Sequence, residues 1–168
     1  MLTNRRDSLN IEIDCDDEAA TDRLGACIAE AVVEGMVIEL NGQLGSGKTR
    51  LVRAICEALG VEITQVNSPT FVLLQQYTDG RIPVAHFDTY RLGDTDEFLA
   101  IGADEFTNSS EWLCLIEWAE RVAECLPEDR LRIDISATST NARHFVLNST
   151  GSISAALLQR IRKNTGSQ

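Results

Sequence analysis

The sequence predicts an α/β domain in which strands and helices alternate along the chain. The apolar run Met36–Leu40 is followed by a glycine-rich segment. Apolar residues at helical spacing then run from about Lys48 to Leu59, and Gly60 is suited to cap that helix. Period-2 runs and helical stripes follow one another on either side of this strand–loop–helix unit, which is typical of the α/β class.

The composition is that of one globular domain. Apolar residues make up 43% of the 168 positions and charged residues 24%. Neither a linker nor an internal repeat interrupts the pattern, so residues 1–168 are interpreted as a single domain. The ends, 1–7 and 163–168, are expected to be flexible.

Several observations favour a cytoplasmic protein. No run approaches the roughly 18 apolar residues that a membrane span needs. The first ten residues carry two arginines but no apolar segment of the kind found in secretory signals. The five cysteines are widely separated and form no C-x-x-C pair, which indicates reduced packing residues.

The net charge of −11 disfavours extensive direct contact with nucleic acid. Between Leu92 and Glu120 there are eight acidic residues and no lysine or arginine. A surface of this kind repels phosphate backbones. Any involvement of RNA is therefore expected to pass through a partner protein.

The elements before and after the glycine-rich unit follow from local patterns. An alternating run over 8–15 predicts an opening strand, and Asp16 or Asp17 can cap the helix that follows. Segments 70–78 and 81–90 flank Asp79-Gly80, a dipeptide suited to the type I′ turn of a β-hairpin.

In that hairpin, Pro83 predicts that the second arm is exposed on one edge near its start. The remaining predicted elements are a short helix at 94–100, a buried strand at 112–117, a helix at 118–126, an antiparallel pair at 131–137 and 144–148, and a terminal helix at 153–162.

The glycine-rich segment matches the phosphate-loop pattern G-x-x-x-x-G-K-[ST]. Its eight residues are Gly42, Gln43, Leu44, Gly45, Ser46, Gly47, Lys48 and Thr49. Glycines let successive backbone N–H groups surround an anion, and the start of the following helix adds its positive dipole end. Lys48 can reach the β- and γ-phosphates, and the Thr49 hydroxyl can bind Mg²⁺. A flexible Gly/Ser turn that happens to contain lysine is disfavoured, because the strand before it and the helix after it are both predicted.

Two acids stand where phosphoryl transfer needs them. Asp88 ends the apolar run 84–88, and Glu117 ends 113–117. Ligands in α/β folds bind beyond the carboxyl ends of strands, so both acids are predicted as metal ligands and catalytic residues. Either acid alone has an ordinary reading as a strand-end residue. No Asn-Lys-x-Asp or Asp-x-x-Gly motif follows the loop, which favours ATP over GTP.

Four segments together resemble the bacterial TsaE family, also called YjeE, the small ATPases of tRNA threonylcarbamoyladenosine biosynthesis. They occur in the order seen in that family, and the resemblance covers about Ile11 to Ile135. The phosphate loop is shared by very many proteins, whereas "SPTF", "HFDTYRL" and "EWAER" are more specific. The four segments are residues 40–61, 66–77, 84–92 and 115–122.

The resemblance implies a P-loop NTPase-like three-layer fold with central parallel strands flanked by antiparallel strands. It implies weak ATPase activity with ATP and Mg²⁺, and assembly with the TsaB and TsaD proteins. TsaD is the subunit that transfers the threonylcarbamoyl group to adenosine 37 of tRNAs reading ANN codons. The tRNA would then be held by the partner, and the ATPase would serve repeated turnover rather than the transfer itself.

The resemblance also implies roles for single residues. Lys48 and Thr49 would bind phosphates and Mg²⁺, and Glu117 would be the Walker-B-type acid. Asp88 would orient water or complete the metal shell. Trp118 resembles the family tryptophan beside the nucleotide, although a core aromatic residue that opens a helix is nearly as good a reading.

Four further residues in these segments have less definite readings. Thr70 would be a mobile switch near the γ-phosphate, unless Ser68-Pro69 forms a mere turn. His86 is interpreted as a hydrogen-bonded structural residue. Tyr90 and Arg91 would contact partners or the acid cluster.

Two other functions share the phosphate loop. A small-molecule or nucleoside kinase would need a basic lid, but only Arg121 and Arg130 lie between Leu92 and Leu131. A nucleotide-gated binding module would use ATP to control docking, with hydrolysis incidental. The presence of both predicted acids favours retained hydrolysis.

Overall fold

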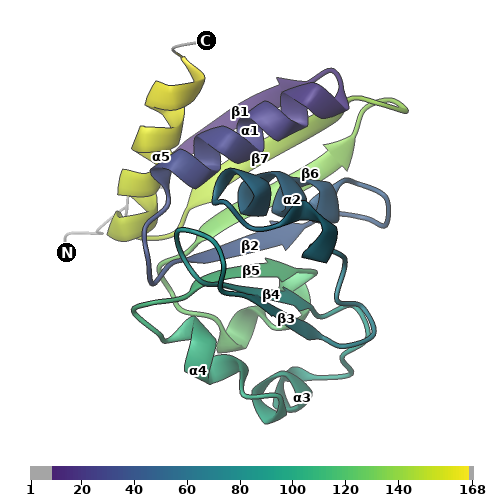
Figure 1. Ribbon diagram of the computed structural model, residues 1–168, viewed down its shortest axis with the longest axis vertical. Coiled ribbons are helices and arrows are strands. Elements are labelled where there is room, and N and C mark those ends of the chain that lie inside the picture. Colours follow the sequence, from purple (N-terminus) through teal and green to yellow (C-terminus); the bar gives the residue numbers. More distant parts are fainter. Residues whose placement is uncertain (1–8, 167–168) are drawn as a thin grey trace, which may run out of the picture.

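The computed structural model describes residues 9–166, in which a central sheet carries helices on both faces (Figure 1). Within these residues the sheet has seven strands, in the order β1-β7-β6-β2-β5-β4-β3. The strands are β1 Asn10–Cys15, β2 Val37–Asn41, β3 Leu74–Tyr77, β4 Val84–Asp88, β5 Leu113–Glu117, β6 Leu131–Ala137 and β7 Arg143–Ser149.

Parallel pairing is confined to the middle of the sheet. β2 pairs in parallel with β5 and with β6, and β4 pairs in parallel with β5. β3 is antiparallel to β4, β7 to β6, and β1 to β7. The prediction of central parallel strands flanked by antiparallel strands is therefore confirmed.

Each face of the sheet has its own apolar core. One core joins the sheet to α1, α2 and α5, and the other joins it to α3, α4 and two 3₁₀ turns. The helices are α1 Glu18–Ala31, α2 Lys48–Ala58, α3 Thr95–Ala100, α4 Ala103–Thr107 and α5 Ser152–Thr165, with 3₁₀ turns η1 Ile63–Gln65, η2 Ala119–Arg121 and η3 Ala123–Cys125. No helix between residues 9 and 166 is long and apolar enough to cross a membrane.

The register of the central strands brings the two predicted acids together. Glu117 at the end of β5 lies opposite Asp88 on one side and opposite Leu40 on the other. The Trp118 N–H continues this pairing, because it donates to the Leu40 carbonyl at 3.0 Å. Since the glycine-rich loop follows β2 directly, it emerges at the same edge of the sheet as both acids (Figure 1).

A glycine lets α1 pack closely on α2. A Cβ at Gly25 would clash with the Ala54 side chain and lie 2.9 Å from the Ala54 carbonyl carbon. We expect Gly25→Ala to lower the melting temperature by roughly 2–10 °C, because overpacking costs about 1–3 kcal/mol and outweighs the better helix propensity of alanine. Thermal unfolding followed by circular dichroism measures this. Glu30→Ala, on the exposed side of α1, is the control, and an unchanged or higher value for Gly25→Ala would contradict the close approach.

The β3–β4 hairpin forms, but its connection is not the predicted type I′ turn. Neither Asp79 nor Gly80 has a positive φ, and the loop spans 78–83. The loop instead folds onto the end of α2, where Arg81 N donates to the Leu59 carbonyl at 2.7 Å. The prediction from Pro83 is also wrong, because β4 lies between β5 and β3 and the exposed edge belongs to β3.

Three other segments differ from the predictions. The helix predicted at 118–126 is replaced by η2 and η3, because the backbone of Val122, with φ of −124° and ψ of 15°, leaves the helical region between them. α4 was not predicted. α5 extends through Thr165, so residues 163–165, expected to be flexible, form its last turn. Residues 1–7 and 167–168 lie outside the described residues.

Candidate functional site

The loop between β2 and α2 has a backbone that only glycine fits at its first position. Gly42 has φ of 152°, and a Cβ there would lie 2.5 Å from the Ile135 carbonyl oxygen and 2.6 Å from Ser46 Oγ. Ser46 is buried, and its Oγ has no hydrogen-bond partner among the described residues. A loop that is this tightly folded, with an unsatisfied polar atom inside it, is suited to hold a polar ligand.

Lys48 lies inside this loop at the start of α2. Its side chain donates through Nζ to the carbonyl oxygens of Gly42 and Gln43, at 2.6 and 3.0 Å. The same ammonium group lies 3.8 Å from the ring centroid of Trp118. Burial lowers the pKa of Lys48, and the acids Glu117, Glu120 and Asp88 oppose that shift. The loop thus concentrates positive charge at a helix N-terminus, where anions are bound.

Thr49 and Glu117 meet on one side of the lysine. The Thr49 hydroxyl lies 2.9 Å from each carboxylate oxygen of Glu117. Glu117 is only 2% exposed. A hydroxyl beside a carboxylate is a donor set that suits Mg²⁺. Between residues 9 and 166 no group of three or more His, Cys, Asp or Glu residues could hold a metal ion.

Asp88 is held by a cluster of donors from the neighbouring loop. Its Oδ2 accepts hydrogen bonds from Ser68 Oγ at 2.8 Å and Thr70 Oγ1 at 2.6 Å. Its Oδ1 accepts one from the backbone N–H of Tyr90 at 2.9 Å. The carboxylate is therefore oriented, and Thr70 contacts it directly.

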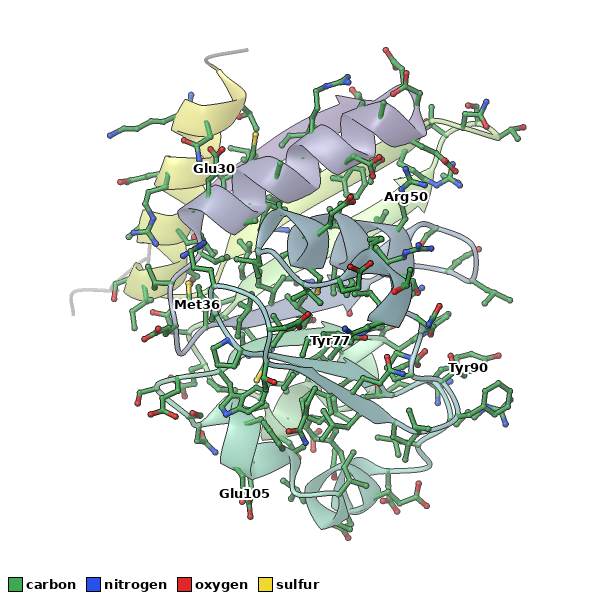
Figure 2. All side chains as sticks on the ribbon, in the orientation of Figure 1. Glu30, Met36, Arg50, Tyr77, Tyr90 and Glu105 are labelled. Atoms are coloured by element: carbon green, nitrogen blue, oxygen red, sulfur yellow. The ribbon has the colours of Figure 1, made fainter. Side chains whose placement is uncertain are left out.

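These residues surround one cavity of about 390 Å³, a volume within the roughly 300–1,000 Å³ usual for small-molecule sites. Trp118 and Tyr90 form one wall, with ring centroids 4.8 Å apart. Figure 2 shows Arg50 and Tyr90 on the side where the loop after β2 projects. The lining residues are Leu44, Gly45, Gly47, Lys48, Thr49, Arg50, Ser68, Thr70, Asp88, Tyr90, Glu117 and Trp118.

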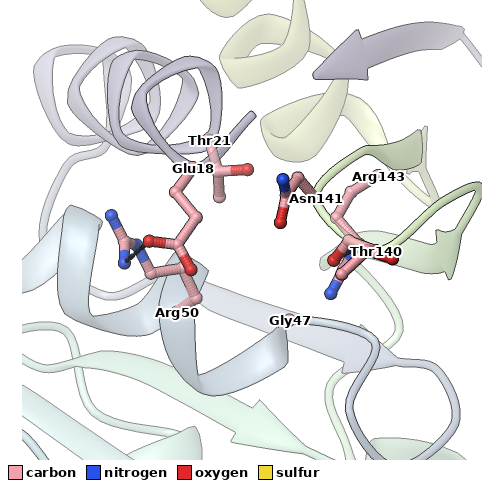
Figure 3. A pocket seen from close by; sticks show the side chains of 7 residues that line it. All are labelled: Glu18, Thr21, Gly47, Arg50, Thr140, Asn141 and Arg143. Atoms are coloured by element: carbon pink, nitrogen blue, oxygen red, sulfur yellow. Dashed lines mark hydrogen bonds and ion pairs between the residues drawn. The ribbon is translucent and has the colours of Figure 1, made fainter. Parts of the chain in front are cut away.

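A second, smaller cavity lies on the other side of Gly47 (Figure 3). Its volume of about 60 Å³ matches about two water molecules rather than an organic ligand. Arg143 reaches from β7 across this side and donates to the Gly45 carbonyl at 3.3 Å. Arg50 is fixed there by Asp22, with Nη2 to Oδ2 at 2.6 Å, and by Glu18. These contacts support the loop from behind.

Among the predicted site residues that the structure brings to the large cavity are Lys48, Thr49, Asp88, Glu117 and Trp118. Trp118 is half-buried and lines the cavity, which favours the reading as a residue beside the ligand over that as a core aromatic. Gly45, Gly47 and Leu44 also line it, whereas Gly42, Gln43 and Ser46 contribute backbone or lie beneath it.

Some of the contacts are not predicted by the sequence. They are the hydrogen bond of Ser68 to Asp88 and the contact of Arg143 with the loop. A hydroxyl close to a loop proline was the only signal for Ser68, and Arg143 had none, because 98 positions separate it from Gly45. Four of the five cysteines are buried, as expected of packing residues.

Comparisons with known proteins relate this chain to one family. Residues 15–145 match the family model described as "Threonylcarbamoyl adenosine biosynthesis protein TsaE". The chain is 36% identical to tRNA threonylcarbamoyladenosine biosynthesis protein TsaE of Bacillus subtilis, over 77% of this chain and 80% of the relative. It is 37% identical to the protein of that name in Treponema pallidum, over 76% and 92%. The crystal structure of Bacillus subtilis YdiB superposes with a TM-score of 0.76 at 25% identity, over 94% of this chain and 97% of that one.

Proposed function

The chain belongs to the TsaE family, and we propose that it binds ATP with Mg²⁺ and hydrolyses it slowly in tRNA threonylcarbamoyladenosine biosynthesis. The observation that carries this proposal is the convergence of Lys48, Thr49, Glu117 and Asp88 on one cavity. A triphosphate with Mg²⁺ needs a cation beside its phosphates, and a hydroxyl and carboxylates beside the metal ion.

Each residue has a defined task in the proposed reaction. Loop N–H groups and Lys48 would hold the phosphates, for which Lys48 leaves the carbonyl oxygens that it now contacts. Thr49 and Glu117 would hold Mg²⁺, which when bound neutralises charge on the phosphate oxygens. Asp88 would orient the attacking water or complete the metal shell. Its Oδ1 accepts the Tyr90 N–H and has a second lone pair with which it can accept a hydrogen bond from that water.

The partners proposed for this chain are TsaB- and TsaD-type proteins in the cytoplasm. Its net charge of −11 supports an indirect link to tRNA, with the nucleic acid held by a partner. We expect tRNA modification over many turnovers to require this chain and ATP, whereas a single round proceeds without them.

Reconstitution tests this role. TsaB- and TsaD-type proteins, tRNA and the other substrates are combined with the chain, with Lys48→Ala, or with neither, and modified adenosine is counted per complex. Only the mixture that contains the wild-type chain is expected to give several modifications per complex. Equal yields in all three mixtures would contradict the proposal.

The exposed side chains beside the site favour a nucleotide-gated binding module as the second candidate. Phe71 and Val72 are 82% and 61% exposed and follow directly after Thr70, which contacts Asp88. A ligand that draws Thr70 away from Asp88 would move this apolar pair. Partner binding that depends on ATP but persists in a variant without hydrolysis would favour this function.

The kinase alternative receives no support from the two arginines considered for a lid. Arg121 donates to the Leu92 carbonyl at 3.4 Å and lies over the Tyr90 ring. Arg130 donates through Nε to the buried Glu39 at 2.6 Å. Incubation with ATP and a panel of nucleosides is expected to yield no phosphorylated nucleoside.

A further inference from the structure

A chain of polar contacts lies behind Glu117, on the side away from the cavity. His86 on β4 is 0% exposed, and its Nε2 lies 2.8 Å from Glu117 Oε1. The other ring nitrogen, Nδ1, lies 3.3 Å from the Tyr77 hydroxyl. Tyr77 in turn donates to Gln75 Oε1 at 2.6 Å, and both of these residues belong to β3. Figure 2 labels Tyr77 in the middle of the molecule.

The strand register explains why these side chains meet. Gln75 lies opposite His86 across the β3–β4 pair, and His86 lies opposite Leu115 across the β4–β5 pair. Glu117 is two residues beyond Leu115, so its side chain is on the same face as that of His86. The chain of contacts therefore runs across three adjacent strands.

The contact has a defined direction. A carboxylate offers only acceptors, so His86 Nε2 carries a hydrogen and donates a hydrogen bond to Glu117 Oε1. Burial raises the pKa of Tyr77, so its hydroxyl stays protonated and donates its one hydrogen to Gln75. Tyr77 then supports the imidazole by packing behind it, with the hydroxyl 3.3 Å from Nδ1, while Nε2 holds Oε1 in front.

The contacts divide the Glu117 carboxylate into two functional ends. Oε1 is shared between His86 and Thr49, whereas Oε2 has a hydrogen bond only to Thr49 among the described residues. Without the imidazole, the carboxylate is free to rotate about its last bond, and a buried carboxylate oxygen loses a nitrogen donor. Orientation of this kind is what hydrogen-bond partners of metal ligands provide.

We propose that His86, braced by Tyr77, is a positioning residue that orients Glu117 for Mg²⁺. This inference rests on the proposed function, because it assigns His86 a part in the binding of the same ion. A positioning role differs from a purely structural role in one respect. Replacing His86 should weaken the Mg²⁺-dependent part of nucleotide binding and leave unchanged the part that the phosphate loop provides.

The test compares His86→Leu, His86→Gln and Tyr77→Phe with the wild-type chain. His144→Gln, a change of the other histidine, which pairs with Asp14 away from the cavity, is the matched control. The shift in melting temperature caused by ATP is measured in EDTA and across a Mg²⁺ titration, and ATP hydrolysis is followed over the same titration.

We expect His86→Leu to raise the half-saturating Mg²⁺ concentration by about 10- to 100-fold, as for other partners of metal ligands. The ATP-induced shift in EDTA should stay as in the wild type. His86→Gln should recover part of the loss, because its amide N–H can donate to Glu117. Tyr77→Phe should shift the Mg²⁺ requirement in the same direction by less.

Three results overturn the inference while leaving the proposed function intact. The first is a wild-type Mg²⁺ requirement in folded His86 variants, and the second is a loss of ATP binding in EDTA as large as in Mg²⁺. If His86→Leu does not fold, a wild-type requirement in both His86→Gln and Tyr77→Phe is the third. A wild-type chain that shows no Mg²⁺-dependent ATP binding would instead contradict the proposed function itself.

Discussion

Replacing Lys48 with alanine is expected to weaken ATP binding by roughly 30- to 3,000-fold, because removing one partner of a buried charge-assisted contact costs about 2–5 kcal/mol. The ammonium group lies inside the loop, on two carbonyl oxygens and against the Trp118 ring. Burial already lowers its pKa, so the folded chain bears a cost for this charge that a phosphate would offset. Isothermal titration calorimetry with ATP and Mg²⁺ measures the change.

The other lysine of the chain provides the matched control. Lys163 lies on α5, and Lys163→Ala makes the same chemical change away from the cavity. The affinity for ATP should then equal that of the wild type. Equal affinities for wild type and a folded Lys48→Ala would contradict the assignment of the loop as the phosphate site.

Replacing either acid with its amide is expected to leave ATP bound but to stop turnover. Glu117→Gln and Asp88→Asn keep the side-chain volumes, and both acids are 2% exposed, so the cavity should keep its shape. We expect hydrolysis to fall by roughly 10²- to 10⁴-fold, the range for loss of a group that orients or activates a reactant. Steady-state phosphate release and ATP titration measure the two properties separately.

Glu105→Gln removes one carboxylate from the exposed part of α4 and serves as the control. It should hydrolyse ATP at the wild-type rate. A wild-type rate of hydrolysis in both Glu117→Gln and Asp88→Asn would show that these acids take no part in the reaction. Loss of ATP binding in both variants would instead indicate a structural role.

The parts of the fold that the sequence predicts well are those with a local cause. The phosphate loop is indicated in the sequence by its own glycines and by the neighbouring strand and helix. Asp88 and Glu117 were identified because each ends a short apolar strand, and parallel strands bring such ends to one edge. Both signals are contained within a few residues.

The parts that the sequence did not predict depend on distant contacts. Ala119, Val122 and Leu126 are spaced as on a helix and all are buried, yet they belong to 3₁₀ turns and the residues after them. The Trp118 N–H donates a hydrogen bond to the Leu40 carbonyl, and Trp118 has left-handed backbone angles. No residue close in sequence indicates either feature. Likewise, the contact between Arg143 and the loop exists only because β7 lies beside β6 and β6 beside β2.

A crystal structure with Mg²⁺ and a non-hydrolysable ATP analogue would test the central claim most directly. We predict phosphates enclosed by residues 42–49 and Lys48 moved from the Gly42 and Gln43 carbonyl oxygens onto a phosphate. Mg²⁺ should lie between Thr49 and Glu117, which separates two groups that now touch at 2.9 Å. A nucleotide bound elsewhere, or a metal ion that contacts neither residue directly or through water, would contradict it.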